Sequence, residues 1–256
     1  MFALYDWFGY KLATKERYRL IKKAGFDAVL LWWGAYLDRK DYRNDPQAAC
    51  EAGLVIENIH APFQLQDDIW QDDLCGEAAF ACYMQCVADC AAFEIPTVVV
   101  HLPDDDKPCN ALGLSRIMRL AERAERLDVN IALENLANIK NLSYMLEHVN
   151  SAHIGFCYDC CHHVRNDPQI DLLALFGSRM MALHLHDYRE DAIHRLPFDG
   201  EIDWAATMQR IARAGYAGSI AIEAMNWGYQ DLSATEFVSK AFQSAQRLEA
   251  LCATAR

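Results

Sequence analysis

The residues best suited to chemistry lie in a short stretch, Met181–Asp187, with the sequence Met-Ala-Leu-His-Leu-His-Asp. Its alternation of side chains predicts a strand with His184 and His186 on one face. Two imidazoles and a terminal carboxylate are costly to bury at the end of an apolar strand unless they have partners. A single strand histidine is usually a hydrogen-bonded core residue, so this stretch alone leaves core packing and ligand binding open.

Other predicted strands also end in a histidine or an acidic residue. Taken singly, each of these polar residues could cap a helix or bond to a neighbouring backbone. Six of them on six strands are not explained by capping, and they predict one shared site. They are His60, His101, Glu134, Asp159, His184 and Glu223.

Eight strands must position these residues, and they alternate with helices along the chain. Strands are predicted over 2–5, 28–32, 55–60, 97–101, 130–134, 154–159, 181–187 and 219–223. Helices are predicted over 14–24, 46–52, 76–93, 115–127, 141–149, 170–176, 204–214 and 233–252, and a loop over 188–200. This pattern predicts a (β/α)8 TIM barrel, in which residues 1–256 form a single domain.

Active sites of such barrels gather at the carboxyl ends of the strands, which is where the six residues lie. Small residues stand two positions before four of the strand ends, on the same predicted face. They indicate a cavity floor, although a tightly packed layer of small side chains is the alternative. They are Ala132, Cys157, Ala182 and Ala221.

The composition limits the choice of partners. The chain has 24 Lys and Arg against 36 Asp and Glu, a formal net charge of −12, which argues against nucleic acid as a partner. Residues 1–10 contain no signal-peptide pattern, and no stretch approaches the roughly 18 apolar residues of a membrane span. We therefore expect a cytoplasmic protein without a membrane partner, and leave self-association open. The placement of the ten cysteines favours reduced thiols.

Four of the six residues combine hard oxygen ligands with one nitrogen ligand. They are Glu134, Asp159, His184 and Glu223. Two glutamates, one aspartate and one imidazole suit Mn2+, Mg2+, Co2+ or Zn2+, and the residue types do not choose among these ions. Adding His60 and His101 would create a second, more nitrogen-rich site suited to zinc.

Short motifs at the strand ends extend this pattern. They are Ile59-His60-Ala61-Pro62, Val100-His101, Leu133-Glu134-Asn135, Asp159-Cys160-Cys161-His162, His184-Leu185-His186-Asp187, Ile222-Glu223 and the loop residues His194, Pro197-Phe198-Asp199-Gly200 and Ile202-Asp203-Trp204. Together they resemble the xylose isomerase-like TIM barrels, a superfamily that includes sugar and sugar-phosphate isomerases and epimerases as well as apurinic endonucleases.

The resemblance implies specific roles. Glu134, Asp159, His184 and Glu223 would bind the divalent metal ion, and His162 would match a substrate-binding histidine. Glu134 and Glu223 would also act as the catalytic acid and base, moving a proton through an enediolate.

We further predict that His186, Arg189 and His194 bind the substrate. That substrate would be a small sugar or polyol, with or without a phosphate. The reaction would be isomerisation or epimerisation, and dehydration of a keto-polyol through the same enediolate is a related option.

The alternative reading is a zinc-dependent endonuclease-like phosphodiesterase. In it His60 and His101 would share a zinc ion with Glu134, and His162, His194 and Asp191 would resemble a third site. Asp191 and His194 are three residues apart, whereas the endonucleases space the corresponding pair by two. A barrel that binds metal or sugar without turnover is a third reading, and the presence of both glutamates argues against it.

Overall fold

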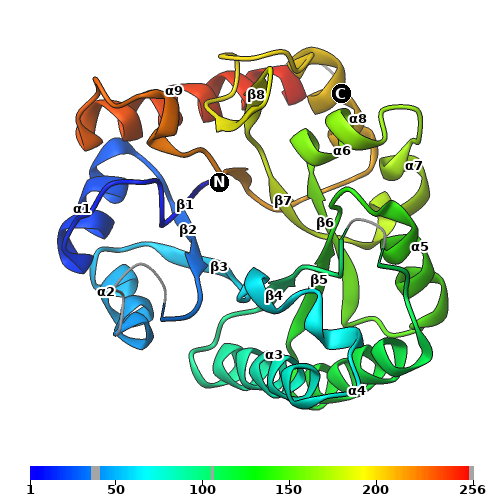
Figure 1. The fold of residues 1–256 in the computed structure, drawn as a ribbon. Helices are drawn as coiled ribbons and strands as arrows, with labels where there is room; N and C mark the ends of the chain where they lie inside the picture. The colour runs from blue at the N-terminus through cyan, green and yellow to red at the C-terminus, as the bar shows by residue number, and fades with distance from the viewer. Residues whose placement is uncertain (36–40, 105–106, 254–256) are drawn as a thin grey trace. The chain divides into compact units, whose positions relative to one another are not determined.

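The computed structural model describes residues 1–35, 41–104 and 107–253. Within that part, eight strands form one sheet in the order β10-β1-β2-β3-β4-β5-β6-β7. Helices alternate with the strands along the chain (Figure 1). The predicted (β/α)8 TIM-barrel class is therefore confirmed. Contacts between residues divide the chain into two compact units, which are described in turn.

The first unit comprises Met1–Glu57, Asp171–Ser178 and Leu183–Arg256. Its strands are β1 (Phe2–Tyr5), β2 (Ala28–Trp32), the first half of β3 (Val55–His60), β8 (Asp187–Arg189), β9 (Ala192–Arg195) and β10 (Ile220–Ile222). Its helices are α1 (Thr14–Ala24), α2 (Asp45–Glu51), α7 (Leu172–Phe176), α8 (Trp204–Arg213) and α9 (Ala234–Ala253).

In this unit β1 lies between β10 and β2, and both pairings are parallel. Leu185, which directly follows His184, forms a parallel bridge with Ile222 of β10. Helix α9 packs against α1 and α8 and covers β1 and β10 (Figure 1). One buried cluster of this unit combines small and large side chains, and it includes Ala221 from the predicted small layer. Its members are Ala3, Tyr5, Ala28, Leu30, Ala221 and Met225.

The second unit comprises Asn58–Ile170 and Arg179–Ala182. It contains the end of β3, β4 (Thr97–Val100), β5 (Asn130–Glu134), β6 (Ile154–Asp159) and most of β7 (Met180–His184). Its helices are α3 (Leu74–Ala92), α4 (Ala111–Leu127), α5 (Ile139–His148) and α6 (Cys160–Asn166). Helices α3 and α4 lie side by side and pack against β4 and β5 (Figure 1).

Parallel pairing connects β3, β4, β5 and β6, and the register sets Glu134 opposite Cys157. Ala132, Cys157 and Ala182 pack together with Val99 in one buried cluster. The predicted small residues of this unit therefore pack together in a buried layer.

Around β6 and β7, three features differ from the sequence prediction, while several other elements begin or end one to four residues from their predicted bounds. The strand expected to reach Asp187 ends at His184. The loop expected over 188–200 contains an antiparallel hairpin, β8–β9. Helix α6 begins directly after β6 and had not been predicted, because Asp159 both ends the strand and caps the helix.

Two further expectations concern the cysteines and the helices. All ten cysteines lie in the described part of the chain, and no disulfide links any of them there. Within the described ranges, no helix combines the length and apolar character needed to cross a membrane.

Candidate functional site

Each of the six candidate residues lies at or just after the carboxyl end of its strand. In the second unit, His60, Glu134 and Asp159 are the last residues of β3, β5 and β6, and His101 follows β4. In the first unit, His184 ends β7 and Glu223 follows β10. The sequence therefore located these positions correctly, and the geometry within each unit shows what they can do.

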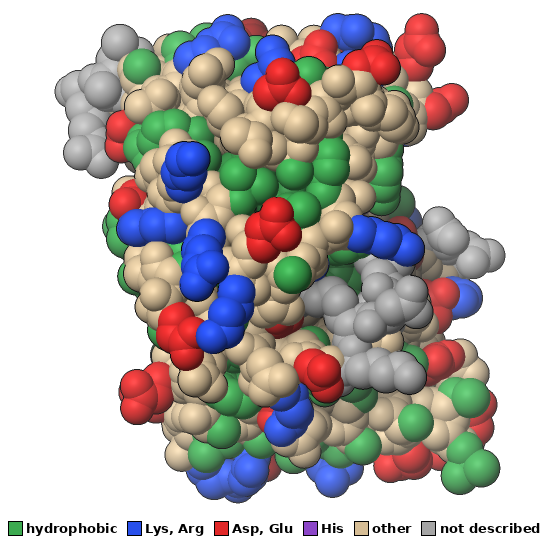
Figure 2. All heavy atoms as spheres, turned by 90° about the vertical axis from the view of Figure 1, so that its left-hand side faces the viewer, with side chains coloured by type: hydrophobic (Ala, Val, Ile, Leu, Met, Phe, Trp, Pro, Cys, Tyr) green, Lys and Arg blue, Asp and Glu red, His purple; other side chains and the backbone are tan. Residues whose placement is uncertain are grey.

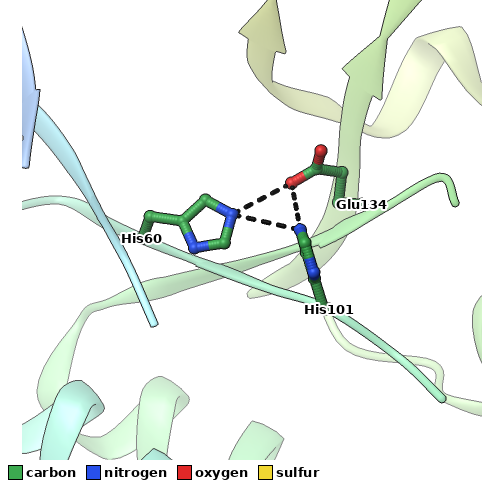
Figure 3. A group of neighbouring side chains, drawn as sticks. All are labelled: His60, His101 and Glu134. Carbon is green, nitrogen blue, oxygen red and sulfur yellow. Dashed lines mark hydrogen bonds and ion pairs between the residues drawn. The ribbon is translucent and has the colours of Figure 1, made fainter. Parts of the chain in front are cut away.

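The second unit brings His60, His101 and Glu134 together (Figure 3). The Nε2 atoms of the two imidazoles are 3.1 Å apart. The Oε2 atom of Glu134 lies 3.3 Å from Nε2 of His60 and 3.1 Å from Nε2 of His101. His60 and Glu134 are buried, and the His101 side chain is 14% exposed.

Neighbouring acceptors determine the ring tautomers of this group. Nδ1 of His60 lies 2.8 Å from the carbonyl oxygen of Ala61, and Nδ1 of His101 lies 2.8 Å from Oε1 of Gln66. Both Nδ1 atoms therefore carry the proton and donate it, so the Nε2 lone pairs face each other and the carboxylate. Three electron-rich atoms so close together require a shared cation, either a proton or a metal ion.

A metal ion fits this arrangement. Burial lowers the pKa of His101, while the charge of Glu134 opposes that shift. The uncharged imidazole is the form that binds metals, and two imidazoles with one carboxylate are typical zinc ligands. The hydrogen bonds at Nδ1 orient both rings toward the shared point.

Asp159 is fixed at the end of β6 by a reciprocal pair of bonds. Its backbone N–H donates to Oδ1 of Asn135 at 2.8 Å, and Nδ2 of Asn135 donates to its carbonyl oxygen at 2.9 Å. Its carboxylate accepts the backbone N–H of His162 at 2.7 Å and so begins α6. Asn135 thereby locks the end of β5, which carries Glu134, to the end of β6.

In the first unit His184 and Glu223 form a close pair. Nδ1 of His184 lies 3.2 Å from Oε2 of Glu223, and both side chains are buried. The ring of Tyr5 lies 6.5 Å from that of His184. The pair is compatible with two ligands on one ion, or with an imidazole that orients a catalytic carboxylate.

The hairpin brings two more histidines to Glu223. The rings of His186 and His194 stack with centroids 4.2 Å apart, and the backbone N–H of His194 donates to Nδ1 of His186 at 3.1 Å. Nδ1 of His194 lies 3.1 Å from the carbonyl oxygen of Glu223. Potential ligand atoms of His186, His194 and Glu223 all lie within 4.8 Å of one another.

Two predicted residues, Arg189 and Asp191, are exposed. The guanidinium of Arg189 lies 3.1 Å from Oδ1 of Asp199, and its side chain is 55% exposed. Asp191, which the endonuclease hypothesis assigned to a third metal site with His194, lies in the turn of the hairpin. The residue whose ring stacks on His194 is His186.

Sequence reasoning missed Gln66 and the structural role of Asn135. Asn135 directly follows Glu134 in the motif Leu133-Glu134-Asn135, so its position beside the next strand end could have been inferred. Gln66 lies in a loop after the short 3-10 turn Phe63–Leu65. The sequence around Gln66 gives no sign that its side chain orients His101.

Comparison with known proteins identifies the family. A family model described as xylose isomerase-like TIM barrel matches residues 18–244. The chain belongs to this family.

Members of the family and similar folds were found among curated proteins and solved structures. The uncharacterised protein y4fM of Sinorhizobium fredii is 30% identical over 183 residues, covering 65% of this chain and 58% of that protein. The chain thus spans less than two thirds of that relative's length. A xylose isomerase domain protein from Alicyclobacillus acidocaldarius superposes with a TM-score of 0.75 at 20% identity, covering 99% of this chain and 98% of the other.

A D-psicose 3-epimerase from Clostridium cellulolyticum, solved with D-tagatose, superposes with a TM-score of 0.78 at 16% identity. The alignment covers 98% of this chain and 99% of the epimerase. At these identities the likeness establishes the xylose isomerase-like fold, and the reaction has to be argued from the residues.

Proposed function

We propose that this member of the xylose isomerase-like family is a metal-dependent sugar or polyol isomerase or epimerase. The main support is that each of the two predicted acid/base glutamates is held by imidazoles of its own unit, Glu134 by His60 and His101, and Glu223 by His184. The likeness to a D-psicose 3-epimerase is consistent with this class of substrate.

The proposed metal ligands are Glu134, Asp159, His184 and Glu223, with His60, His101 and Glu134 as the ligands of a second ion. Mn2+, Mg2+, Co2+ and Zn2+ all suit the first set, and zinc suits the second. A bound divalent ion would supply a Lewis acid that stabilises negative charge on the oxygens of an enediolate.

The protein's own groups would move the proton. One glutamate would remove the proton from the carbon next to the carbonyl, and the other would return one, so that configuration or carbonyl position changes. His162, His186 and His194 would contact substrate hydroxyl groups. Dehydration of a keto-polyol would begin with the same proton abstraction.

Glu134→Gln and Glu223→Gln test the proposal. Each should lower solvent deuterium incorporation into a ketose by about 100-fold or more, because an amide cannot act as a general base. The assay uses D-psicose and D-tagatose with the metal-loaded protein. Removal of metal by a chelator should abolish exchange, and Mn2+ or Zn2+ should restore it. Glu122→Gln, at an exposed position on α4, is the matched control.

Two outcomes would contradict the proposal. Full exchange in both glutamine variants would remove the acid/base roles. Turnover of the ketose by the wild-type protein without any solvent exchange would replace the enediolate by a hydride shift.

A zinc-dependent phosphodiesterase is the second candidate. The observation that favours it is the nitrogen-rich group His60, His101 and Glu134, because a zinc ion held by such ligands would activate water for attack on a phosphate. The charge of the chain argues against it.

A further inference from the structure

Asp187 carries a fully buried carboxylate that the proposed proton transfer does not use. Its Oδ1 atom accepts the backbone N–H groups of Tyr188 at 2.9 Å and Ile202 at 3.1 Å. Its Oδ2 atom accepts the backbone N–H of Phe198 at 3.1 Å and the indole N–H of Trp204 at 2.8 Å. Four donors thus offset the cost of burying this carboxylate.

The donors come from a segment, 198–204, that runs close to β8. A Cβ atom on Gly200 would lie 2.1 Å from the carbonyl oxygen of Tyr188 and 2.3 Å from Oδ1 of Asp187. The backbone N–H of Glu201 donates to the same carbonyl oxygen at 3.0 Å. Glycine is therefore required where the segment passes Asp187, and the carboxylate holds the segment against β8.

Asp187 is also directly connected to the two histidines of the hairpin. It follows His186 in the chain and pairs with Arg195, the neighbour of His194, in the β8–β9 register. His194 in turn bonds to Nδ1 of His186 and lies beside the backbone of Glu223. A shift of Asp187 would therefore move both rings relative to Glu223.

A second carboxylate holds the other strand of the hairpin. Oδ2 of Asp199 lies 2.7 Å from Nη2 of Arg195 and accepts the hydroxyl of Tyr229 at 2.5 Å. The Tyr229 oxygen accepts the backbone N–H of Leu196 at 3.0 Å. A carboxylate thus fixes each strand of the hairpin: Asp187 holds β8, and Asp199 holds β9.

We propose that Asp187 is a positioning residue, which fastens segment 198–204 to β8 and thereby fixes the stacked His186–His194 pair beside Glu223. The proposal gives Asp187, Gly200 and Trp204, which lie in three separate motifs of the sequence, one shared role. Its catalytic consequence rests on the proposed function, whereas the ring geometry can be tested without turnover.

Asp187→Asn is the decisive variant. It keeps the size of the side chain but turns one oxygen into an NH2 group, which then faces two N–H donors. We expect the nuclear Overhauser contacts between the rings of His186 and His194 to disappear in protein with labelled histidine. We expect kcat for proton exchange with D-psicose to fall about 100-fold, the loss typical of a misplacement near 1 Å.

A graded variant and two controls separate positioning from general loss of stability. Trp204→Phe removes one of the four donors and should give an intermediate loss of ring contacts and kcat. Asp203→Asn should change neither, because asparagine replaces aspartate well as the N-cap of α8. Asn110→Ala removes an N-cap in the other unit and should lower stability while leaving kcat and the ring contacts unchanged.

The outcomes are distinct. Asp187→Asn with intact ring contacts and wild-type kcat would overturn the positioning role and leave the proposed function standing. If the wild-type protein exchanges no proton with either ketose, the proposed function fails, and the ring contacts alone decide whether Asp187 positions the histidines.

Discussion

Four buried carboxylates at or near the strand ends have two kinds of partner. Glu134 and Glu223 face imidazole nitrogens, whereas Asp159 and Asp187 accept backbone or indole N–H groups. Fixed N–H donors stabilise a carboxylate as an anion and hold it in place. A carboxylate beside imidazoles can exchange protons or share a cation. This difference is the reason for assigning proton transfer to the glutamates and positioning to Asp187.

The sequence predicted that His60, His101 and Glu134 lie together, but not the tautomers of the two rings. Their proximity could be inferred because the carboxyl ends of parallel strands meet at one edge of a sheet. Their tautomers depend on Gln66 and the carbonyl of Ala61, which only the loop conformations bring into contact. The substrate role given to Arg189 stays a prediction, and its guanidinium bonds to Asp199.

Glu57, in the first half of β3, gives a prediction for the pH dependence of stability. Burial raises the pKa of Glu57, and the hydroxyl of Ser219, which donates to Oε1 at 2.5 Å, opposes that shift. The unfolded chain therefore releases this proton at lower pH than the folded protein. As the pH rises above about 4.5, the free energy of unfolding should decrease until it passes the folded pKa.

Glu57→Gln removes this titration but keeps an acceptor for Ser219. The variant should be more stable than the wild type at about pH 7, and the difference should disappear near pH 4. Urea unfolding at the two pH values measures it. A stability difference of the same size at both would mean that the carboxyl does not titrate differently in the folded and unfolded states.

Among the elements, most strands were predicted with their observed ends. Five match residue for residue, because short apolar runs are bounded by polar or turn-forming residues. They are Phe2–Tyr5, Ala28–Trp32, Val55–His60, Asn130–Glu134 and Ile154–Asp159. The β8–β9 hairpin could not be predicted in this way. Its sequence is polar, and its conformation depends on bonds from Asp187 and Asp199 to residues elsewhere in the first unit.

Helix α4 was predicted to begin at Ser115 but begins at Ala111. Asn110 caps it by accepting the backbone N–H of Gly113 at 2.8 Å. The glycine in the first turn weakened the helical pattern in the sequence. The structure supplies the reason for the glycine, because a Cβ atom there would lie 1.4 Å from Cε3 of Trp70.

Gly113→Ala should therefore destabilise the protein. Helix propensity alone favours alanine by about 1 kcal/mol. The clash with Trp70 should outweigh it, since overpacking costs about 1–3 kcal/mol or more. Urea unfolding gives the sign directly. Ser115→Ala, at an exposed position of the same helix, is the control and should be neutral or slightly stabilising. A gain in stability for Gly113→Ala would contradict the close packing.

At the scale of the whole molecule, charge separates the two enzyme classes. The formal net charge is −12. The face shown in Figure 2, which includes α1, carries several basic side chains close together. The exposed basic residues of α1 are Lys15, Arg19, Lys22 and Lys23, and they lie on a helix rather than on the loops that follow the strands. A nuclease needs its phosphate contacts around the catalytic residues.

A duplex with an abasic site should therefore bind weakly and remain uncut in the presence of Zn2+, while ketoses or their phosphates should raise the melting temperature. Affinity for the duplex, measured by fluorescence anisotropy over a range of salt concentrations, should lack the steep salt dependence of a protein that neutralises many phosphates. Glu134→Gln, assayed in parallel, excludes a contaminating nuclease. Efficient incision by the wild type that is lost in this variant would favour the phosphodiesterase over the isomerase. Two metal ions per chain would not decide the question, because the group of His60, His101 and Glu134 is compatible with either chemistry.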